Sequence, residues 1–369
     1  GPSCAGPNPR GWWGRLLRMP TVSQHLLAAI FLAASFCVPL LAHELGLIQI
    51  EAAFKKDGTY AVDLLVDREH LPLQVSGAAM APDVFLRGIE KEAVLSFDDK
   101  PVAHGVPEVT TVEGKPNVTR LRMTGKTPAE VSRFTFADNA IMGFFVIKLH
   151  SEGRDGTVTQ WVDGGKSSPP YPLDRAVVPL TRWQIVKLYL RLGFTHILPR
   201  GLDHVLFVLG IFLLAVDLKP VLWQVSAFTL AHTITLALTV YGVVSLSPRV
   251  VEPLIALSIV YVAVENVFTS KLHAWRPVVV FCFGLLHGMG FAGVLTEIGL
   301  PRSEFIPALL SFNAGVEGGQ LTVILVAFLV FGLAFRKKPW YRQRIVIPGS
   351  LLIAAIGLYW SIQRIFFVS

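Results

Sequence analysis

Hydrophobic and polar positions follow two different patterns along the 369 residues of the chain. Between residues 44 and 178, short runs rich in β-branched and aromatic residues alternate with turns that contain Gly, Asp, Asn and Pro. Several short runs at this spacing predict a β-sandwich domain. The expected strands lie at residues 45–54, 60–66, 93–97, 118–123, 134–136, 141–149 and 158–162.

Long apolar segments replace these short runs after a Ser- and Pro-rich linker at residues 167–172. Six segments are apolar enough to predict membrane-spanning helices, although the first of them is short. The expected spans lie at residues 202–216, 221–244, 250–269, 277–298, 305–335 and 345–367. Just before them, residues 182–195 mix basic and apolar residues at helical spacing, which predicts a helix lying in the membrane interface.

The N-terminal residues have the pattern of a secretory leader. Arg10, Arg15 and Arg18 precede an apolar run at residues 26–41, and Ala42 supplies a small residue at the expected cleavage point. A retained membrane anchor is the alternative interpretation. We therefore predict a leader at residues 1–42, an extracytoplasmic β-sandwich-like domain at 43–178, a linker and interfacial helix at 179–200, and a six-helix transmembrane domain at 201–369.

Composition supports a polytopic α-helical membrane bundle preceded by an exported β-sandwich domain. The chain is 52% hydrophobic and only 16% charged, whereas soluble domains carry roughly 25% charged residues. The net charge of +7 does not indicate a nucleic-acid partner, because much of it lies in the first twenty residues and at residues 336–344. Basic clusters beside apolar segments set membrane orientation instead. The three cysteines offer neither a disulfide framework nor a CxxC metal site.

The distribution of basic residues predicts how the chain is oriented. Loops after the first, third and fifth predicted spans carry most of these residues, including five between residues 336 and 344. The opposite loops hold mainly Arg249 and Arg302. Because loops rich in Lys and Arg remain in the cytoplasm, this bias predicts a multi-pass protein of the inner (plasma) membrane with the β domain on the periplasmic side.

Polar residues recur inside the apolar segments, where they are costly and indicate functional sites by default. The candidates are His196, Asp203, His204, His232, Glu265, His287, Asn313 and Glu317. Imidazole and carboxylate groups together suit first-row transition metals. We therefore expect most of these side chains to face one another around a polar cavity. The alternative is that they only join neighbouring helices, and Glu265 is placed to pair with a cation of an adjacent loop.

Four short motifs in the helical part of the chain contain the candidate residues. They are His196 with Gly201-Leu-Asp203-His204, Ala231-His232-Thr, Leu286-His287-Gly288 and Phe312-Asn313-Ala-Gly-Val-Glu317. These motifs resemble the HupE/UreJ family, whose members are regarded as nickel permeases and are associated with hydrogenase and urease gene clusters. The resemblance runs from about residue 192 to the C-terminus. The family signature HPxxGxDH keeps its order here, but Pro199 is not next to His196. The large β domain is also absent from short family members.

Three functions are compatible with these observations. The first is a permease for a transition-metal ion of the Ni²⁺ or Co²⁺ type, in which the histidines bind the ion and the acids offset its charge. The second is an intramembrane hydrolase that uses Zn²⁺ with Glu317 as general base, although HExxH and GxSxG are absent from the sequence. The third is a membrane-anchored metal sensor or assembly factor that binds a protein partner through its β domain. The sequence contains no GxxxxGK[ST] loop for ATP.

Overall fold

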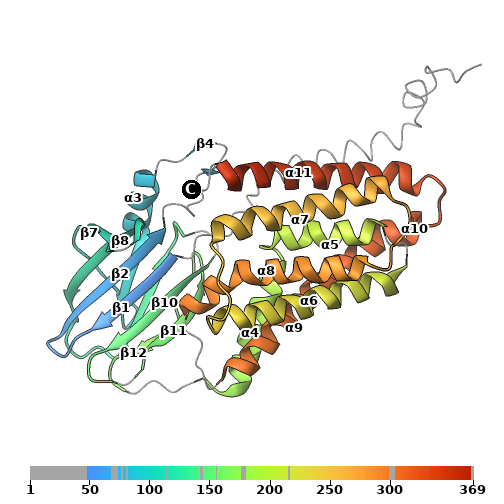
Figure 1. Cartoon of the computed structure of the whole chain (residues 1–369). Coiled ribbons are helices and arrows are strands. Elements are labelled where there is room, and N and C mark those ends of the chain that lie inside the picture. Colours follow the sequence, from blue (N-terminus) through green and yellow to red (C-terminus); the bar gives the residue numbers. More distant parts are fainter. Residues whose placement is uncertain are drawn as a thin grey trace, which may run out of the picture. The chain divides into compact units, whose positions relative to one another are not determined.

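The computed structural model describes residues 48–67, 74–75, 78–79, 82–113, 115–141, 144–154, 156–175, 180–214, 217–298 and 304–366. The predicted leader at residues 1–42 lies outside this part of the chain. The described residues form a β-rich region followed in sequence by a set of helices (Figure 1).

The strands of the β-rich region form two larger sheets. Six strands pair in the order β11-β10-β1-β2-β8-β7, and four pair in the order β12-β9-β5-β6. The first sheet contains β1 (Ile48–Phe54), β2 (Thr59–Asp67), β7 (Glu108–Val112), β8 (Lys115–Lys126), β10 (Phe144–Ser151) and β11 (Val158–Asp163). The second contains β5 (Ala93–Phe97), β6 (Lys100–Val102), β9 (Arg133–Asp138) and β12 (Tyr171–Pro172). The remaining elements are helix α3 (Pro82–Glu92) and the paired strands β3 (Gln74–Val75) and β4 (Ala78–Ala79).

Alternating burial along the strands produces the core between these two sheets. In β1, Ile50, Ala52 and Phe54 are buried while the residues between them are more exposed, because successive side chains of a strand point to opposite faces. The Phe54 ring lies 6.3 Å from that of Phe97 and 5.0 Å from that of Phe134, both in the second sheet. The predicted β-rich N-terminal region is confirmed, and its two packed sheets have the arrangement of a sandwich, while the predicted domain bounds stay predictions.

All seven predicted strands are present, with bounds that differ by a few residues. The helix α3 and the short strands β3, β4, β6, β7 and β12 were not predicted. Strand β1 pairs with β10 in parallel and with β2 in antiparallel orientation, and a local pattern of hydrophobic residues does not indicate which distant strand a given strand joins.

The helical region begins with a broken pair. Helix α4 (Arg182–Ile197) starts with a capping box, in which the backbone N–H of Thr181 donates to the Gln184 side chain at 2.8 Å. It ends before Pro199, because a residue that precedes proline is disfavoured in the helical conformation. Helix α5 (Leu202–Leu214) then continues at an angle of 69°.

Longer helices follow this broken pair. They are α6 (Leu218–Val240), α7 (Pro248–Phe268), α8 (Arg276–Ile298), α9 (Phe305–Ala327) with its continuation η3 (Phe328–Gly332) and α10 (Leu333–Phe335), and α11 (Ile347–Phe366), which is preceded by η4 (Arg342–Val346). Helix α6 packs along α8, α7 packs along α11, and α4 of the broken pair packs along α9.

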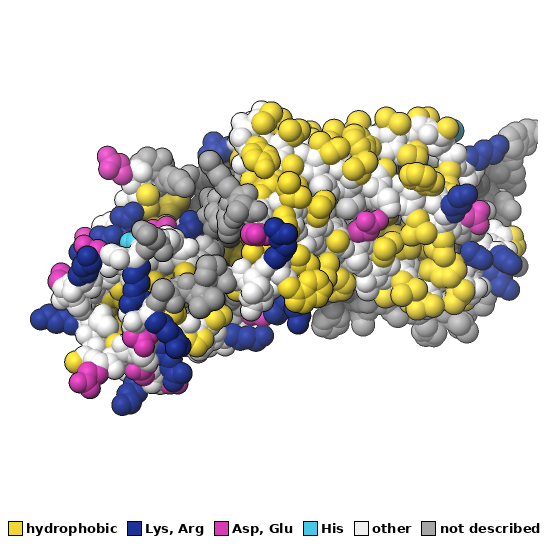
Figure 2. Space-filling model, turned by 90° about the horizontal axis from the view of Figure 1, so that it is seen from below, with side chains coloured by type: hydrophobic (Ala, Val, Ile, Leu, Met, Phe, Trp, Pro, Cys, Tyr) yellow, Lys and Arg dark blue, Asp and Glu magenta, His cyan; other side chains and the backbone are white. Residues whose placement is uncertain are grey.

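Four helical segments of the described chain are long and apolar enough to cross a membrane, namely α6, α7, Phe305–Phe335 and Arg342–Phe366. The pair α4 and α5 is a fifth candidate if it forms one bent span, and α8 offers a shorter apolar stretch, Arg276–Phe291. On the face drawn in Figure 2, hydrophobic side chains cover the helices, whereas charged side chains are concentrated over the β-rich region. Membrane-spanning helices are therefore confirmed, while the total of six and the interfacial position of residues 182–195 stay predictions.

Glycines allow the helices that carry the candidate site residues to approach one another closely. A Cβ atom on Gly315 of α9 would lie 2.1 Å from the carbonyl oxygen of Leu190 in α4, and one on Gly193 of α4 would lie 1.8 Å from that of Phe312. Gly284 and Gly288 of α8 make the same kind of contact with the α6 backbone. These small residues set the distance between helices, as is common in membrane bundles.

The contact between α4 and α9 predicts that adding one methyl group lowers stability more at one glycine of α9 than at another. We expect Gly315→Ala to destabilise the protein by about 1–3 kcal/mol, because the new group meets backbone that cannot move aside. Gly318→Ala is the matched control on the same helix, since its Cβ would lie 3.8 Å from the Phe194 ring. Thermal unfolding in detergent measures both variants, and equal midpoints would contradict the close contact.

The β region contains a buried carboxyl group that predicts a pH effect. Asp138 accepts a hydrogen bond from the Ala140 backbone N–H at 2.8 Å, while its Oδ2 is buried without a hydrogen-bond partner. Burial raises the pKa of Asp138 from 3.8 to about 7. The folded state therefore binds a proton that the unfolded state has released, so this group lowers stability as pH rises from about 4 to 7.

We expect Asp138→Asn to remove this part of the pH dependence while keeping the acceptor for the Ala140 N–H. Hydrogen–deuterium exchange of β9 in the full-length protein at pH 4 to 8, corrected for the intrinsic exchange rate, measures the effect. The expectation fails if the wild-type protein and the variant show the same dependence on pH.

Candidate metal centre

The break between α4 and α5 places two candidate histidines against each other. His196 lies in the last turn of α4 and His204 in the first turn of α5. Their Nε2 atoms are 3.2 Å apart. A Cβ on Gly201 would lie 2.3 Å from the His196 carbonyl oxygen, so the tight connection requires glycine at this position. The separation of His196, Gly201 and His204 in the sequence therefore follows from the short connection between α4 and α5.

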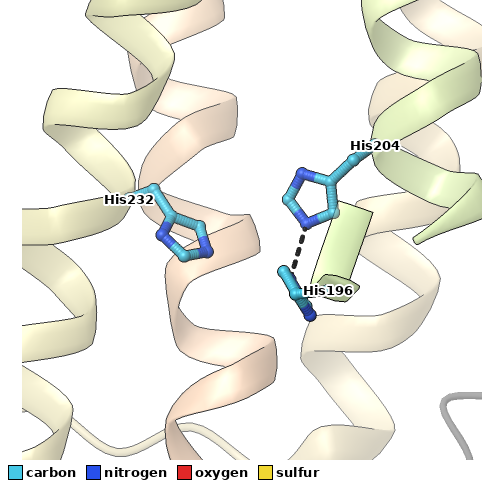
Figure 3. Close-up of side chains that lie close together, drawn as sticks. All are labelled: His196, His204 and His232. Carbon is cyan, nitrogen blue, oxygen red and sulfur yellow. Dashed lines mark hydrogen bonds between the residues drawn. The ribbon is translucent and has the colours of Figure 1, made fainter. Parts of the chain in front are cut away.

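A third histidine completes the group from α6. His196, His204 and His232 each offer a ring nitrogen, and these three atoms all lie within 4.8 Å of one another. Figure 3 shows the three rings facing a common space from three different helices. His204 and His232 are buried, and His196 is half-buried. Imidazole nitrogens at this separation can bind one transition-metal ion after small rotations of the rings.

Hydrogen bonds determine which nitrogen of His232 carries the hydrogen. The Asn313 amide N–H donates to the Leu309 carbonyl at 2.9 Å, so the Asn313 Oδ1 faces His232 as an acceptor. The Nδ1 of His232 must therefore donate to this oxygen, at 3.0 Å. This leaves the lone pair on Nε2, which is buried without a hydrogen-bond partner. An amide that fixes a ring in this way is typical of metal-binding histidines.

The same reasoning applies to His287 of α8. The Ser258 hydroxyl donates to the Ile255 carbonyl at 2.6 Å, so it can only accept from the Nε2 of His287, at 3.1 Å. The lone pair of His287 is then on Nδ1, which is buried and lacks a partner. The His287 ring lies 4.9 Å from that of His204. His287 therefore stands beside the three-histidine group with a lone pair available.

Phenylalanine rings surround these histidines. Phe207 and Phe228 lie 5.3 and 5.0 Å from the His287 ring, and Phe291 lies 4.2 Å from that of His196. Phe312 stacks on Phe291 at 5.0 Å. Aromatic walls keep water away and favour neutral imidazole, which is the form that binds metal.

The candidate acids lie outside the three-histidine group and have other partners. Asp203 accepts from Arg364 at 2.8 Å, and Glu317 accepts from Ser226 at 2.8 Å. Glu265 lies 3.4 Å from the guanidinium of Arg276, which is the pairing with a loop cation that the sequence left open. The structure thus brings together four histidines and Asn313, and it places the three acids in separate contacts.

Two buried arginines were not among the residues singled out for the site. Arg276 is 1% exposed and Arg364 is 7% exposed, and each contacts one of the candidate acids. In the sequence, each arginine is a basic residue close to the end of an apolar span. This position could have indicated a buried ion pair, but basic residues there more often mark the membrane surface.

Comparison with known protein families assigns the helical region to a family. The family described as HupE / UreJ protein matches residues 173–364, which is more than half of the chain. The chain belongs to the HupE/UreJ family. The matched range includes all eight candidate residues of this HupE/UreJ chain and begins after the β strands. Neither a curated protein nor a solved structure matches the chain.

The contact between Asn313 and His232 predicts a selective loss of metal affinity. We expect Asn313→Ala to weaken Co²⁺ binding by roughly 10–100-fold, because the ring loses the group that orients its lone pair. Ser226→Ala is the control, since it removes another polar contact between α6 and α9 that touches no histidine. Titration calorimetry of the detergent-purified protein measures both, and equal affinities would contradict the assigned orientation.

Proposed function

We propose that this HupE/UreJ protein is a membrane permease for a divalent transition-metal ion of the nickel or cobalt type. The observation that carries the proposal is the group formed by His196, His204 and His232, whose nitrogens lie within 4.8 Å of one another among apolar helices. The metal is the cargo, and the bilayer is the protein's environment. The family is regarded as nickel permeases, which supports the same class of cargo.

The chemistry of the histidine group suits this cargo. Neutral imidazole binds Zn²⁺, Cu²⁺, Fe²⁺ and Ni²⁺, whereas Mg²⁺ and Ca²⁺ prefer oxygen ligands. A transported ion must be bound well enough to enter and weakly enough to leave. Three imidazoles without a carboxylate in the group satisfy this requirement better than a closed set of charged ligands, because the ion is held without full charge compensation.

The arrangement favours transport over a zinc-dependent hydrolase. Three histidines with an open position are a known catalytic zinc set, but hydrolysis also needs a general base near the bound water. Glu317, the candidate base, accepts a hydrogen bond from Ser226 and lies outside the histidine group. Asp203 is paired with Arg364. No carboxylate of the described residues stands in the group itself.

We further propose that the protein lies in the inner membrane with its β domain outside the cytoplasm, where this domain meets the cargo or a protein partner. The support is the excess of basic residues in alternate loops, together with the leader-like N-terminal pattern.

Uptake of radiolabelled Ni²⁺ or Co²⁺ into proteoliposomes tests the transport function. We expect His204→Ala to reduce uptake to the level of empty vesicles. His204 supplies one of the three ring nitrogens of the group, and without it only His196 and His232 remain to bind the ion. Ser226→Ala, which leaves the histidines untouched, should retain transport.

Three other results separate the alternatives. Bound zinc that does not exchange, without vectorial flux, indicates a hydrolase. Full function in His204→Ala, with loss on deletion of residues 44–178, indicates a sensor or assembly factor. Uptake of Mg²⁺ in preference to Ni²⁺ would contradict a site built from imidazole.

A further inference from the structure

A buried arginine on the last helix neutralises the carboxylate next to the histidine group. The guanidinium of Arg364 in α11 donates from Nη2 to the Oδ2 of Asp203 at 2.8 Å and from Nη1 to the Glu252 carbonyl at 3.1 Å. The ring of Trp360 lies 5.8 Å from the same guanidinium. Both members of the ion pair are buried. A buried pair of this kind contributes little net stability, so its presence beside a candidate site calls for another explanation.

Asp203 has a second oxygen that this pair does not use. Its Oδ1 is buried without a hydrogen-bond partner, although an ionised carboxylate can accept several hydrogen bonds or bind a cation. Asp203 precedes His204 directly on α5. Asp203 therefore adjoins the three-histidine group through the backbone of His204, while its side chain points about 100° away from that of His204 around the helix and does not belong to the group.

The charges of the histidines, Asp203 and Arg364 determine how this region interacts with a metal ion. The histidines are neutral when they bind metal, and the ion pair next to His204 in the sequence has no net charge, because Asp203 carries −1 and Arg364 carries +1. A dication is attracted by the carboxylate and repelled by the guanidinium. In an apolar bundle both effects act over longer distances than in water, because the dielectric constant is low.

We propose that Arg364 is a positioning residue that weakens metal binding so that the ion can leave. By holding the Asp203 carboxylate and adding a positive charge near the histidines, it prevents the site from binding the dication too tightly for release. This inference rests on the proposed transport function. It assigns a role to a residue of α11, which contributes no histidine to the site.

Charge-changing variants test this role by the direction of their effects. Relative to the wild-type protein, we expect Arg364→Gln to bind Co²⁺ about tenfold more tightly and Asp203→Asn about tenfold more weakly. In uptake assays Arg364→Gln should show a lower KM together with a lower maximal rate. Arg364→Lys keeps the charge and should stay close to wild type in both measurements.

The double variant distinguishes a charge effect from a loss of structure. Asp203→Asn with Arg364→Gln has the same net charge as the wild-type protein, so its affinity should rise about tenfold above that of Asp203→Asn alone. This comparison contains no unpaired buried carboxylate, and it remains usable if Arg364→Gln does not fold. Because Asp203→Asn leaves a buried guanidinium without its carboxylate, the recovery is assigned to charge only if the two variants have equal thermal unfolding midpoints, whereas recovery that follows a rise in stability indicates a structural role.

Arg276→Gln is the matched control, because Arg276 is the second buried arginine that pairs with a candidate acid, Glu265. Its removal should lower thermal stability without tightening Co²⁺ binding. Ser258 contacts His287, and Glu265 lies about two helical turns further along α7. If Arg276→Gln tightens binding as much as Arg364→Gln does, the effect is not local to Asp203 and the proposal is overturned.

The experiment separates failure of this inference from failure of the proposed function. Absence of Co²⁺ binding by the wild-type protein, or binding that His204→Ala leaves unchanged, overturns the metal centre and this inference with it. Binding that depends on His204, combined with an Arg364→Gln variant that binds no more tightly and a double variant that does not recover affinity, overturns the role of Arg364 alone.

Discussion

A polar group buried among apolar helices must find a partner, and this requirement organises the helical region. An unsatisfied buried donor or acceptor costs about 1–3 kcal/mol. His232 and His287 each have one nitrogen satisfied, by Asn313 and Ser258 respectively, and one nitrogen without a partner in the described structure. The satisfied nitrogens fix the rings, and the unsatisfied ones are the part of the arrangement that an incoming ion can stabilise.

Close backbone contact is what makes this arrangement possible. Gly315 brings α9, with Asn313, against α4, with His196. Gly288 brings α8, with His287, against the backbone of His232 in α6. Larger residues at these positions would hold the helices apart, and ring nitrogens on different helices would then be too distant to share an ion. The broken pair α4 and α5 supplies the remaining proximity, because its short connection leaves His196 and His204 facing each other.

The sequence was sufficient for the apolar helices and the β-rich region, and it named the histidines that the structure brings together. Hydrophobic alternation indicated the strands, apolar length indicated the helices, and the cost of ionisable residues in a membrane indicated His204, His232 and His287. It did not separate the residues that meet from those that do not. Asp203 and Glu317 carry the same signal as the histidines, yet their partners, Arg364 and Ser226, lie far away in the chain. Helical periodicity gives the face on which a side chain lies, but not the helix that this face meets.

The parallel pairing of β1 with β10 has a consequence for how the β domain is made. Strand β1 is the first described strand to emerge during synthesis, yet one of its two neighbours begins only at Phe144. Until that part of the chain has emerged, one edge of β1 offers unpaired backbone groups to any other extended chain. Contacts between such distant segments also slow folding. A β domain with this connectivity therefore needs nearly all of its length before its six-stranded sheet can close.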